Sequence, residues 1–286
     1  MVNNAFFNDY AGRAHKHIGS FASKYLACFA FDGDTARLLS QGAPEKEEMD
    51  CVFNYLKTND LIRDCAINVG ANYGMHSLRF AEHYERVFSF EPHPAVFKIL
   101  DFNIEYNNPQ KNISIFNYGI SDEEQTLTLY DHKGRNIGGS TFEAQNVTDK
   151  EGAYKFECQI KPIDQEKSVT EQKIGLFKID TEGHELHVLK GAKRFIEEQK
   201  PVILMEDWSS RNGQESDAIK FLRELGYTNF LSPETTPAKK YSPNKIENIK
   251  YKLEYLWQLL TQGQTIGLDD CDFSAPNGYD LIVAHQ

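Results

Sequence analysis

The stretch Cys65-Ala66-Ile67-Asn68-Val69-Gly70-Ala71-Asn72-Tyr73-Gly74 decides the class of fold. Its first five residues are mainly apolar and predict a short buried strand. The glycines that follow predict a tight loop, because they allow a sharp turn and a close approach of a ligand to the backbone. A helical pattern begins directly after the loop, at Met75. A strand, a glycine loop and a helix in this order indicate one unit of an α/β sheet.

Outward from this unit, short apolar runs alternate with helical patterns. This alternation predicts a parallel sheet covered on both faces. The expected fold is an α/β, Rossmann-like, doubly wound sheet of seven strands in which the last strand is antiparallel. Two further strands predict an antiparallel β excursion inserted after the third strand. The sheet strands are expected at 65–69, 87–90, 113–118, 174–179, 201–205, 227–231 and 279–284, the main helices at 75–84, 94–106, 185–199 and 215–225, and the excursion at 126–130 and 155–163.

The regions outside this alternation do not show alternating strand and helix patterns. Residues 1–60 look helical, and we expect an N-terminal helical cap before a main domain at 61–286. Within the cap, 18–31 is predicted as a buried helix. A proline followed by glutamates predicts the start of another helix near its end, because both suit a first helical turn. An insert at 232–277 is expected to hold loop and one helix, at 246–260.

Composition limits the class of protein. The chain has 286 residues, of which 40% are apolar and 26% charged, as in folded globular proteins. Its net charge of −11 argues against a nucleic-acid partner. Five widely spaced cysteines without a Cys-x-x-Cys pair argue against a disulfide framework or a thiolate zinc site. No signal peptide or membrane-spanning stretch is found, so we expect a cytoplasmic protein without a membrane partner. The oligomeric state is not indicated.

The loop after the first strand reads Gly70-x-Asn72-x-Gly74. The dinucleotide fingerprint is Gly-x-Gly-x-x-Gly, which leaves bare backbone beside a pyrophosphate. Asn72 places a side chain there instead. The loop therefore disfavours NAD and favours a ligand without phosphates. A purely structural turn that binds nothing is the alternative.

Polar residues also follow the second and third strands. Glu91 lies about 20 residues beyond the glycine loop, where an acidic residue accepts hydrogen bonds from ribose hydroxyls. Ser121 and Asp122 follow the third strand and are expected to flank an adenine, with Ile120 packing on the ring and Asp122 or a backbone group reading its amine. The alternatives are a surface glutamate that caps the next helix and a plain turn.

The fourth strand ends in two carboxylates and a histidine, Asp180, Glu182 and His184. The acids could orient a hydroxyl or the amino group of a cofactor, and His184 could take a proton. Alternatively, Asp180 or Thr181 only caps the following helix. Glu206, after the fifth strand, could complete a magnesium site with the two acids. Nothing in the sequence fixes the geometry of such a site, and we expect no bound metal.

Taken together, these motifs resemble those of the FkbM-type methyltransferases. The matching stretches are 67–74, Phe90-Glu91-Pro92, 178–185 and the later Pro201…Glu206, which occur in the order and spacing of that family. The resemblance covers residues 64–231 and the last strand. It implies a class I methyltransferase fold with S-adenosylmethionine as the cofactor.

The resemblance also implies roles for single residues. By the family pattern, Gly70, Asn72 and Gly74 line the methionine portion of the cofactor, and Glu91 holds the ribose. Asp180 and Glu182 stand near the methyl group.

One position departs from the family pattern. The family usually has Asp where this chain has Asn68. Asn68 can still accept a hydrogen bond at the cofactor site. The lost charge would weaken attraction to the ammonium or sulfonium group of the cofactor.

The resulting hypothesis is transfer of a methyl group to a hydroxyl of a sugar, glycan or secondary metabolite. Positioning and removal of one proton are the work left to the protein. His184 is the first candidate base and Asp180 the second. A non-catalytic module that binds S-adenosylmethionine is the first alternative, for which Asn68 is the main argument. An NAD-dependent oxidoreductase is the second, which the missing third glycine disfavours.

Overall fold

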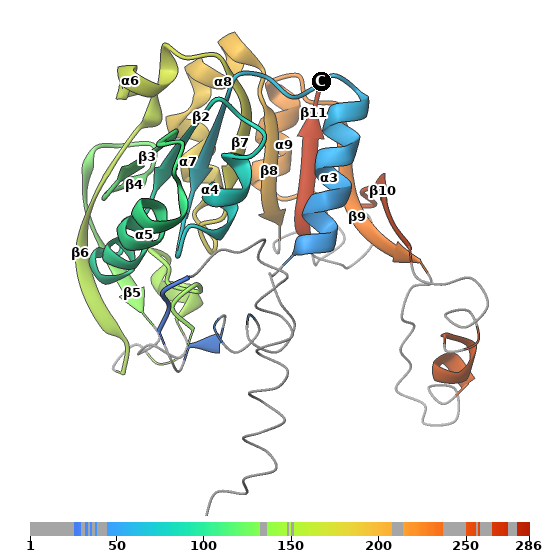
Figure 1. Ribbon diagram of the computed structural model, residues 1–286, viewed down its shortest axis with the longest axis horizontal. Coiled ribbons are helices and arrows are strands. Elements are labelled where there is room, and N and C mark those ends of the chain that lie inside the picture. Colours follow the sequence, from blue (N-terminus) through green and yellow to red (C-terminus); the bar gives the residue numbers. More distant parts are fainter. Residues whose placement is uncertain are drawn as a thin grey trace, which may run out of the picture.

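The computed structural model describes most of the chain from residue 45 onward and a few residues before it (Figure 1). The described residues are 26–29, 32–33, 35, 38, 45–131, 136–147, 149, 152–207, 214–236, 250–255, 257, 265–273 and 279–286. Within these ranges no helix is both long enough and apolar enough to cross a membrane.

The centre of the molecule is an eight-stranded sheet with the order β10-β9-β11-β8-β7-β1-β2-β3. The neighbouring strands β8, β7, β1, β2 and β3 pair in parallel. Strand β11 runs antiparallel to both of its neighbours, β8 and β9. The chain therefore builds outward from β1 in one direction and then from β7 in the other. The bounds are β1 Cys65–Val69, β2 Arg86–Phe90, β3 Ile113–Phe116, β7 Ile174–Ile179, β8 Val202–Asp207, β9 Asn229–Thr236, β10 Thr265–Asp270 and β11 Tyr279–His285.

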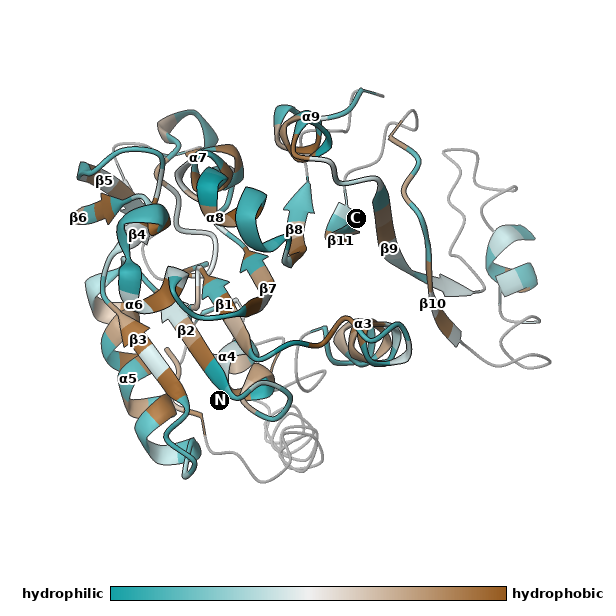
Figure 2. Ribbon diagram, turned by 90° about the horizontal axis from the view of Figure 1, so that it is seen from above, coloured by the Kyte–Doolittle hydropathy of each residue, from teal (hydrophilic) through white to brown (hydrophobic). Residues whose placement is uncertain are grey.

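Helices cover both faces of this sheet, as the view from above shows (Figure 2). One face carries α3 (Lys46–Thr58), α4 (Met75–Phe80) and α5 (Pro94–Asn107). The other carries α7 (Glu185–Gly191), α8 (Lys193–Gln199) and α9 (Asp217–Glu224). The central strands β1 and β7 are buried along their whole length, which explains their unbroken apolar runs. The doubly wound α/β fold predicted from the alternating pattern is confirmed.

A smaller sheet forms the inserted excursion. It has the order β4-β6-β5, with β4 Gly119–Ile120, β5 Gln125–Asp131 and β6 Tyr154–Lys161. Strands β5 and β6 are antiparallel, as expected. Short helical turns follow at η2 (Ala144–Asn146), η3 (Ile163–Gln165) and α6 (Lys167–Thr170) before the chain returns to the main sheet at β7.

The structure differs from the sequence expectation at several places. The main sheet has eight strands instead of seven, because β10 lies in the insert that was expected to hold only loop and helix. Strand β10 is an edge strand with the sequence TIGLDD, in which only Ile266 and Leu268 are apolar, so its alternation is too short to mark a strand. The helix expected at 185–199 is divided into α7 and α8 at Ala192.

The predictions for the N-terminal region and the insert are tested only in part. The helix near the end of residues 1–60 is α3, whose apolar face packs directly on the sheet. Residues 26–29 are described and are not helical, so the helix expected at 18–31 is wrong at its C-terminal end and otherwise lies outside the described residues. Residues 250–255 are helical, as expected, and the rest of the helix placed at 246–260 is described only at residue 257.

One close approach fixes how the glycine loop meets the sheet. Gly70 has a φ of 76°, and a Cβ atom on it would overlap the carbonyl oxygen of Asp180. The Asp180 amide donates to the carbonyl of Val69, and the Gly70 amide donates to that of Phe90, each at 3.1 Å. Three strand ends are therefore joined by backbone contacts that exclude any side chain at position 70.

We expect Gly70→Ala to lower the free energy of unfolding by about 2–4 kcal/mol, because the methyl group must displace backbone and the positive φ is strained for alanine. Urea denaturation followed by circular dichroism measures this loss. The matched control is Gly267→Ala, since no atom lies within 4 Å of the Cβ built there. Equal stabilities of the two variants would contradict the packing role of Gly70.

Candidate functional site

A cavity lies at the carboxyl ends of β1, β2 and β7, beside the point where the strand order reverses. Its empty space is about 620 Å³ and is partly open to solvent. The lining residues are Val69, Gly70, Asn72, Glu91, Pro92, Val96, Gly119, Ile120, Leu129, Ile137, Gly138, Ser140, Phe142, Asp180, Thr181 and His184. Asn72, Glu91 and Asp180, which come from three separate motifs, therefore face one space.

Glu91 is the buried acid of this cavity. Its Oε2 accepts from the backbone amide of Asn72 at 2.9 Å, and its Oε1 accepts from that of His93 at 2.8 Å. Burial raises the pKa of Glu91 to about 7, against the lowering effect of these two hydrogen bonds. Each carboxylate oxygen has a second lone pair for a ligand donor. Asn72 reaches this position with a positive φ of 47°, a conformation that asparagine tolerates well.

Asp180 is the second carboxylate of the cavity and is held by a buried lysine. The Nζ of Lys178, on β7, donates to Asp180 Oδ2 at 2.8 Å. The Lys178 side chain is 3% exposed, whereas 30% of the Asp180 side chain is exposed. Burial opposes the charge of Lys178, but Asp180 and nearby glutamates outweigh it and raise the lysine pKa. The ion pair therefore holds the Asp180 side chain at the cavity wall.

His184 lines the cavity, but both of its ring nitrogens face protein groups. Nδ1 lies 2.8 Å from Glu143 Oε1, and Nε2 lies 2.9 Å from Ser121 Oγ. Burial lowers the pKa of His184. In this arrangement neither nitrogen is directed to a substrate, so the role of His184 as a base stays a prediction without geometric support.

Three other predicted residues lie near the cavity but do not line it. Ser121 is buried behind His184. Asp122 lies beside His187, with 3.0 Å between Oδ1 and Nδ1, so neither side chain is where the adenine prediction placed it. Glu182 has a φ of 54°, and its carbonyl accepts from Thr141 Oγ1 at 2.9 Å, which ties β7's end to the excursion.

Asn68 and Gly74 are placed behind the loop instead of on the cavity wall. The Asn68 amide is fully buried and donates from Nδ2 to Ser77 Oγ at 2.9 Å. Ser89 Oγ also donates to Ser77 Oγ, at 2.8 Å, so a small polar network joins β1, β2 and α4. A Cβ at Gly74 would meet the Leu100 side chain of α5 at 2.7 Å, which gives this glycine a packing role.

Sequence reasoning missed the hydrophobic residues that the excursion contributes. Ile137 and Phe142 form part of the cavity wall, and Phe142 lies beside the ring of His184 with 5.5 Å between centroids. The buried carboxylate of Asp32 accepts from the Ile137 amide at 2.9 Å and from the Tyr73 hydroxyl at 3.0 Å. No local pattern marks these residues, because the chain separates them widely from the glycine loop.

The fold and the cavity together define a doubly wound α/β protein with a pocket at the point where its strand order reverses. Residues 68–228 match the family model of the methyltransferase FkbM domain, which is more than half of the chain. The chain therefore belongs to the FkbM methyltransferase domain family, as its motifs suggested.

The chain spans less than two thirds of the length of the first two relatives it matches. The chain is 27% identical over 170 residues to methyltransferase sdnD of Sordaria araneosa, which covers 50% of this chain and 65% of that protein. It is similar to the crystal structure of methyltransferase FkbM from Methylobacillus flagellatus, at 17% identity and a TM-score of 0.43, over 81% of this chain and 56% of that one. It is also similar to a precorrin 8w decarboxylase from Methanobacterium thermoautotrophicum, at 11% identity and a TM-score of 0.41, over 85% and 92%.

We expect Asn68→Asp, which restores the residue usual in the family, to lower the free energy of unfolding by about 1–3 kcal/mol at pH 8. The Oδ1 of Asn68 finds no hydrogen-bond partner in the part of the chain that the structure describes, so a carboxylate there would be only partly satisfied. Burial would raise the pKa of the new carboxyl, so the loss should shrink as the pH falls. Urea denaturation at pH 5 and pH 8 measures it, and equal stability at pH 8 would contradict the prediction.

Proposed function

We propose that this protein transfers a methyl group from S-adenosylmethionine to a hydroxyl oxygen of a sugar, a glycan or a secondary metabolite. One observation carries the proposal: the Asn72 loop, Glu91 and Asp180 line the same cavity. Membership of the FkbM family supports the cofactor, and the acceptor class rests on the resemblance to family members and on the proton acceptor argued below.

The residues of the cavity suit this cofactor. Glu91 would accept hydrogen bonds from the ribose hydroxyls through its remaining lone pairs. Val96, Ile120 and Leu129 offer an apolar wall for an adenine ring. S-adenosylmethionine contains no pyrophosphate, so the loop does not need a glycine in place of Asn72. When bound, the cofactor would supply an electrophilic methyl group on a sulfonium, and the protein would orient the acceptor and take its proton.

Asp180 is the better-placed proton acceptor. Its carboxylate lines the cavity with almost a third of the side chain exposed, and Lys178 holds its position. His184 has both ring nitrogens in contacts with Glu143 and Ser121. The order of the two candidates is therefore the reverse of the order expected from the sequence: Asp180 first and His184 second.

The case for a non-catalytic binding module is weaker once the position of Asn68 is known. That case rests on a charge missing from the cofactor site. The Asn68 side chain is absent from the cavity lining and donates to Ser77 instead. Its substitution therefore gives no direct reason for loss of activity.

The first test concerns cofactor binding. We expect wild-type protein to bind S-adenosylmethionine about tenfold more weakly at pH 6 than at pH 8, because ribose hydroxyls need the ionised Glu91 and its pKa is raised to about 7. Calorimetric titration at both pH values measures the ratio. Glu91→Gln should weaken binding at pH 8 by about 10–100-fold and abolish the Glu91 part of the pH dependence. An unchanged affinity in Glu91→Gln would contradict the ribose assignment, and calorimetry with NAD tests the oxidoreductase alternative.

The second test concerns turnover. Formation of S-adenosylhomocysteine on a panel of hydroxyl-bearing glycans and small molecules should reveal an acceptor. With that acceptor, Asp180→Asn should lower kcat by about 10²–10⁴-fold, because proton removal is lost. Asp217→Asn, on the surface of α9, is the matched control. If His184→Gln lost turnover while Asp180→Asn retained it, the assignment of the proton acceptor would return to His184.

A further inference from the structure

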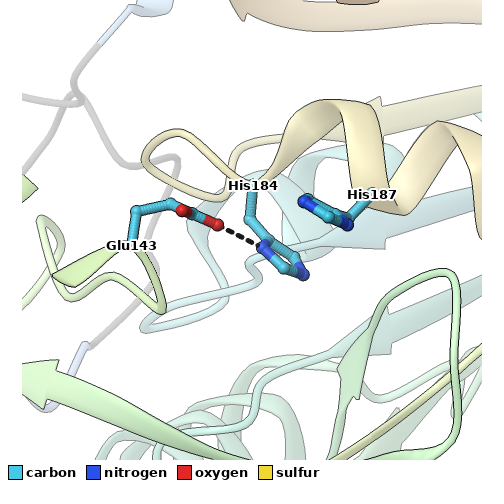
Figure 3. A group of neighbouring side chains, drawn as sticks. All are labelled: Glu143, His184 and His187. Atoms are coloured by element: carbon cyan, nitrogen blue, oxygen red, sulfur yellow. Dashed lines mark hydrogen bonds and ion pairs between the residues drawn. The ribbon is translucent and has the colours of Figure 1, made fainter. Parts of the chain in front are cut away.

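A glutamate and two histidines meet beside the cavity, on the side of the excursion (Figure 3). Glu143 precedes η2 in the inserted excursion, and His184 and His187 lie at the start of α7. One candidate ligand atom from each residue lies within 4.8 Å of the other two. Figure 3 shows the side chains pointing toward one another from these two elements.

The three side chains differ in their exposure to solvent. The side chains of His184, Glu143 and His187 are 4%, 19% and 43% exposed. The two imidazole rings are stacked, with 4.6 Å between centroids and 14° between planes. Glu143 Oε1 lies 2.8 Å from Nδ1 of His184. The cluster is thus open to solvent on the His187 side and closed on the other.

We propose that Glu143, His184 and His187 bind a divalent transition-metal ion, with zinc as the best fit. Two imidazoles and one carboxylate are a ligand set that zinc accepts, and three protein ligands leave a fourth position for water. Imidazole nitrogens disfavour magnesium and calcium, which take oxygen ligands. This site does not require the proposed methyl transfer, although it shares His184 with the wall of the cavity.

The second shell of this site is already in place. The nitrogens that would not bind the metal are each held: Nε2 of His184 faces Ser121 Oγ at 2.9 Å, and Nδ1 of His187 faces Asp122 Oδ1 at 3.0 Å. Ser121 Oγ also donates to Asp122 Oδ1 at 3.1 Å. Metal-binding histidines usually donate their other ring N–H to such groups, which fixes the tautomer and the ring plane. The ligands would then be Nδ1 of His184, Nε2 of His187 and Oε1 of Glu143.

A tetrahedral site requires the side chains to turn, because the two rings are nearly parallel and cannot both direct a lone pair at one ion, and the candidate ligand atoms are only within 4.8 Å of one another. The exposed His187 has room for such a turn. Ligand atoms at about 2.0–2.1 Å from zinc lie roughly 3.3 Å apart, slightly farther than the 2.8 Å between Glu143 and His184. A metal ion would replace the proton shared by these two groups, and the partly exposed Glu143 can turn to make room. By contrast, the nearby group of Asp180, Glu182 and Glu206 already has the Lys178 ammonium as its cation.

The test is zinc binding by the full chain without an affinity tag, after treatment with a chelator. Competition with a chromogenic zinc indicator should give one equivalent of bound zinc. Cobalt(II) in its place should give the visible absorption of a four-coordinate ion. His187→Ala and Glu143→Gln should each weaken zinc binding at least tenfold. The matched control is His76→Ala, which removes a histidine lying 3.4 Å from Glu45 on another surface and should leave binding unchanged.

Two results would overturn the proposal: no stoichiometric zinc binding, or binding that His187→Ala and Glu143→Gln leave intact. Circular dichroism and urea denaturation establish that the variants are folded, and the exposure of His187 makes its variant the safer of the two. S-adenosylmethionine binding is measured on the same samples. Zinc failure with cofactor binding retained would reject this site alone, and cofactor failure with zinc bound would reject the proposed function alone.

Discussion

The contact between Gly70 and the carbonyl of Asp180 is the constraint on which the site depends. Backbone amides at the ends of β1 and β7 pair with carbonyls of the neighbouring strands, so the loops after these strands must leave the sheet almost in contact. A residue with a side chain at position 70 would push the loop away from β7. Asp180 takes part in this contact and Asn72 follows two residues after Gly70, and both residues line the cavity.

The two carboxylates of the cavity have opposite electrostatic settings. Glu91 has only backbone amides as its described hydrogen-bond donors, and burial raises its pKa to about 7. Asp180 faces the ammonium of Lys178 and is partly exposed. One acid is therefore easily neutralised, and the other is paired with a buried cation. In the proposed function, Glu91 would accept hydrogen bonds from the ligand and Asp180 would accept the proton.

The excursion completes the cavity that the main sheet begins. Ile137 and Phe142 close it from the side of β5 and β6, and Thr141 bonds the carbonyl of Glu182. The carboxylate of Asp32, in the N-terminal region, accepts a hydrogen bond from the Ile137 amide. Through Glu143 the excursion also contacts His184. Segments that lie far apart in the sequence thus meet around one pocket.

The sequence by itself determined the doubly wound fold and most of the polar residues at its switch point, because strand periodicity, the glycine loop and Glu91 are local patterns. It could not place Asn68, Ser121 or Asp122 correctly, since the direction of a side chain at a strand end depends on the helix packed behind it. It also missed β10, an edge strand with few apolar residues. Only the tertiary structure decided that Asp180 pairs with Lys178, that both nitrogens of His184 are occupied, and that Glu143 joins two histidines. The contacts of His184 and Glu143 link separate elements, and the geometry of all these contacts follows from packing that no local pattern encodes.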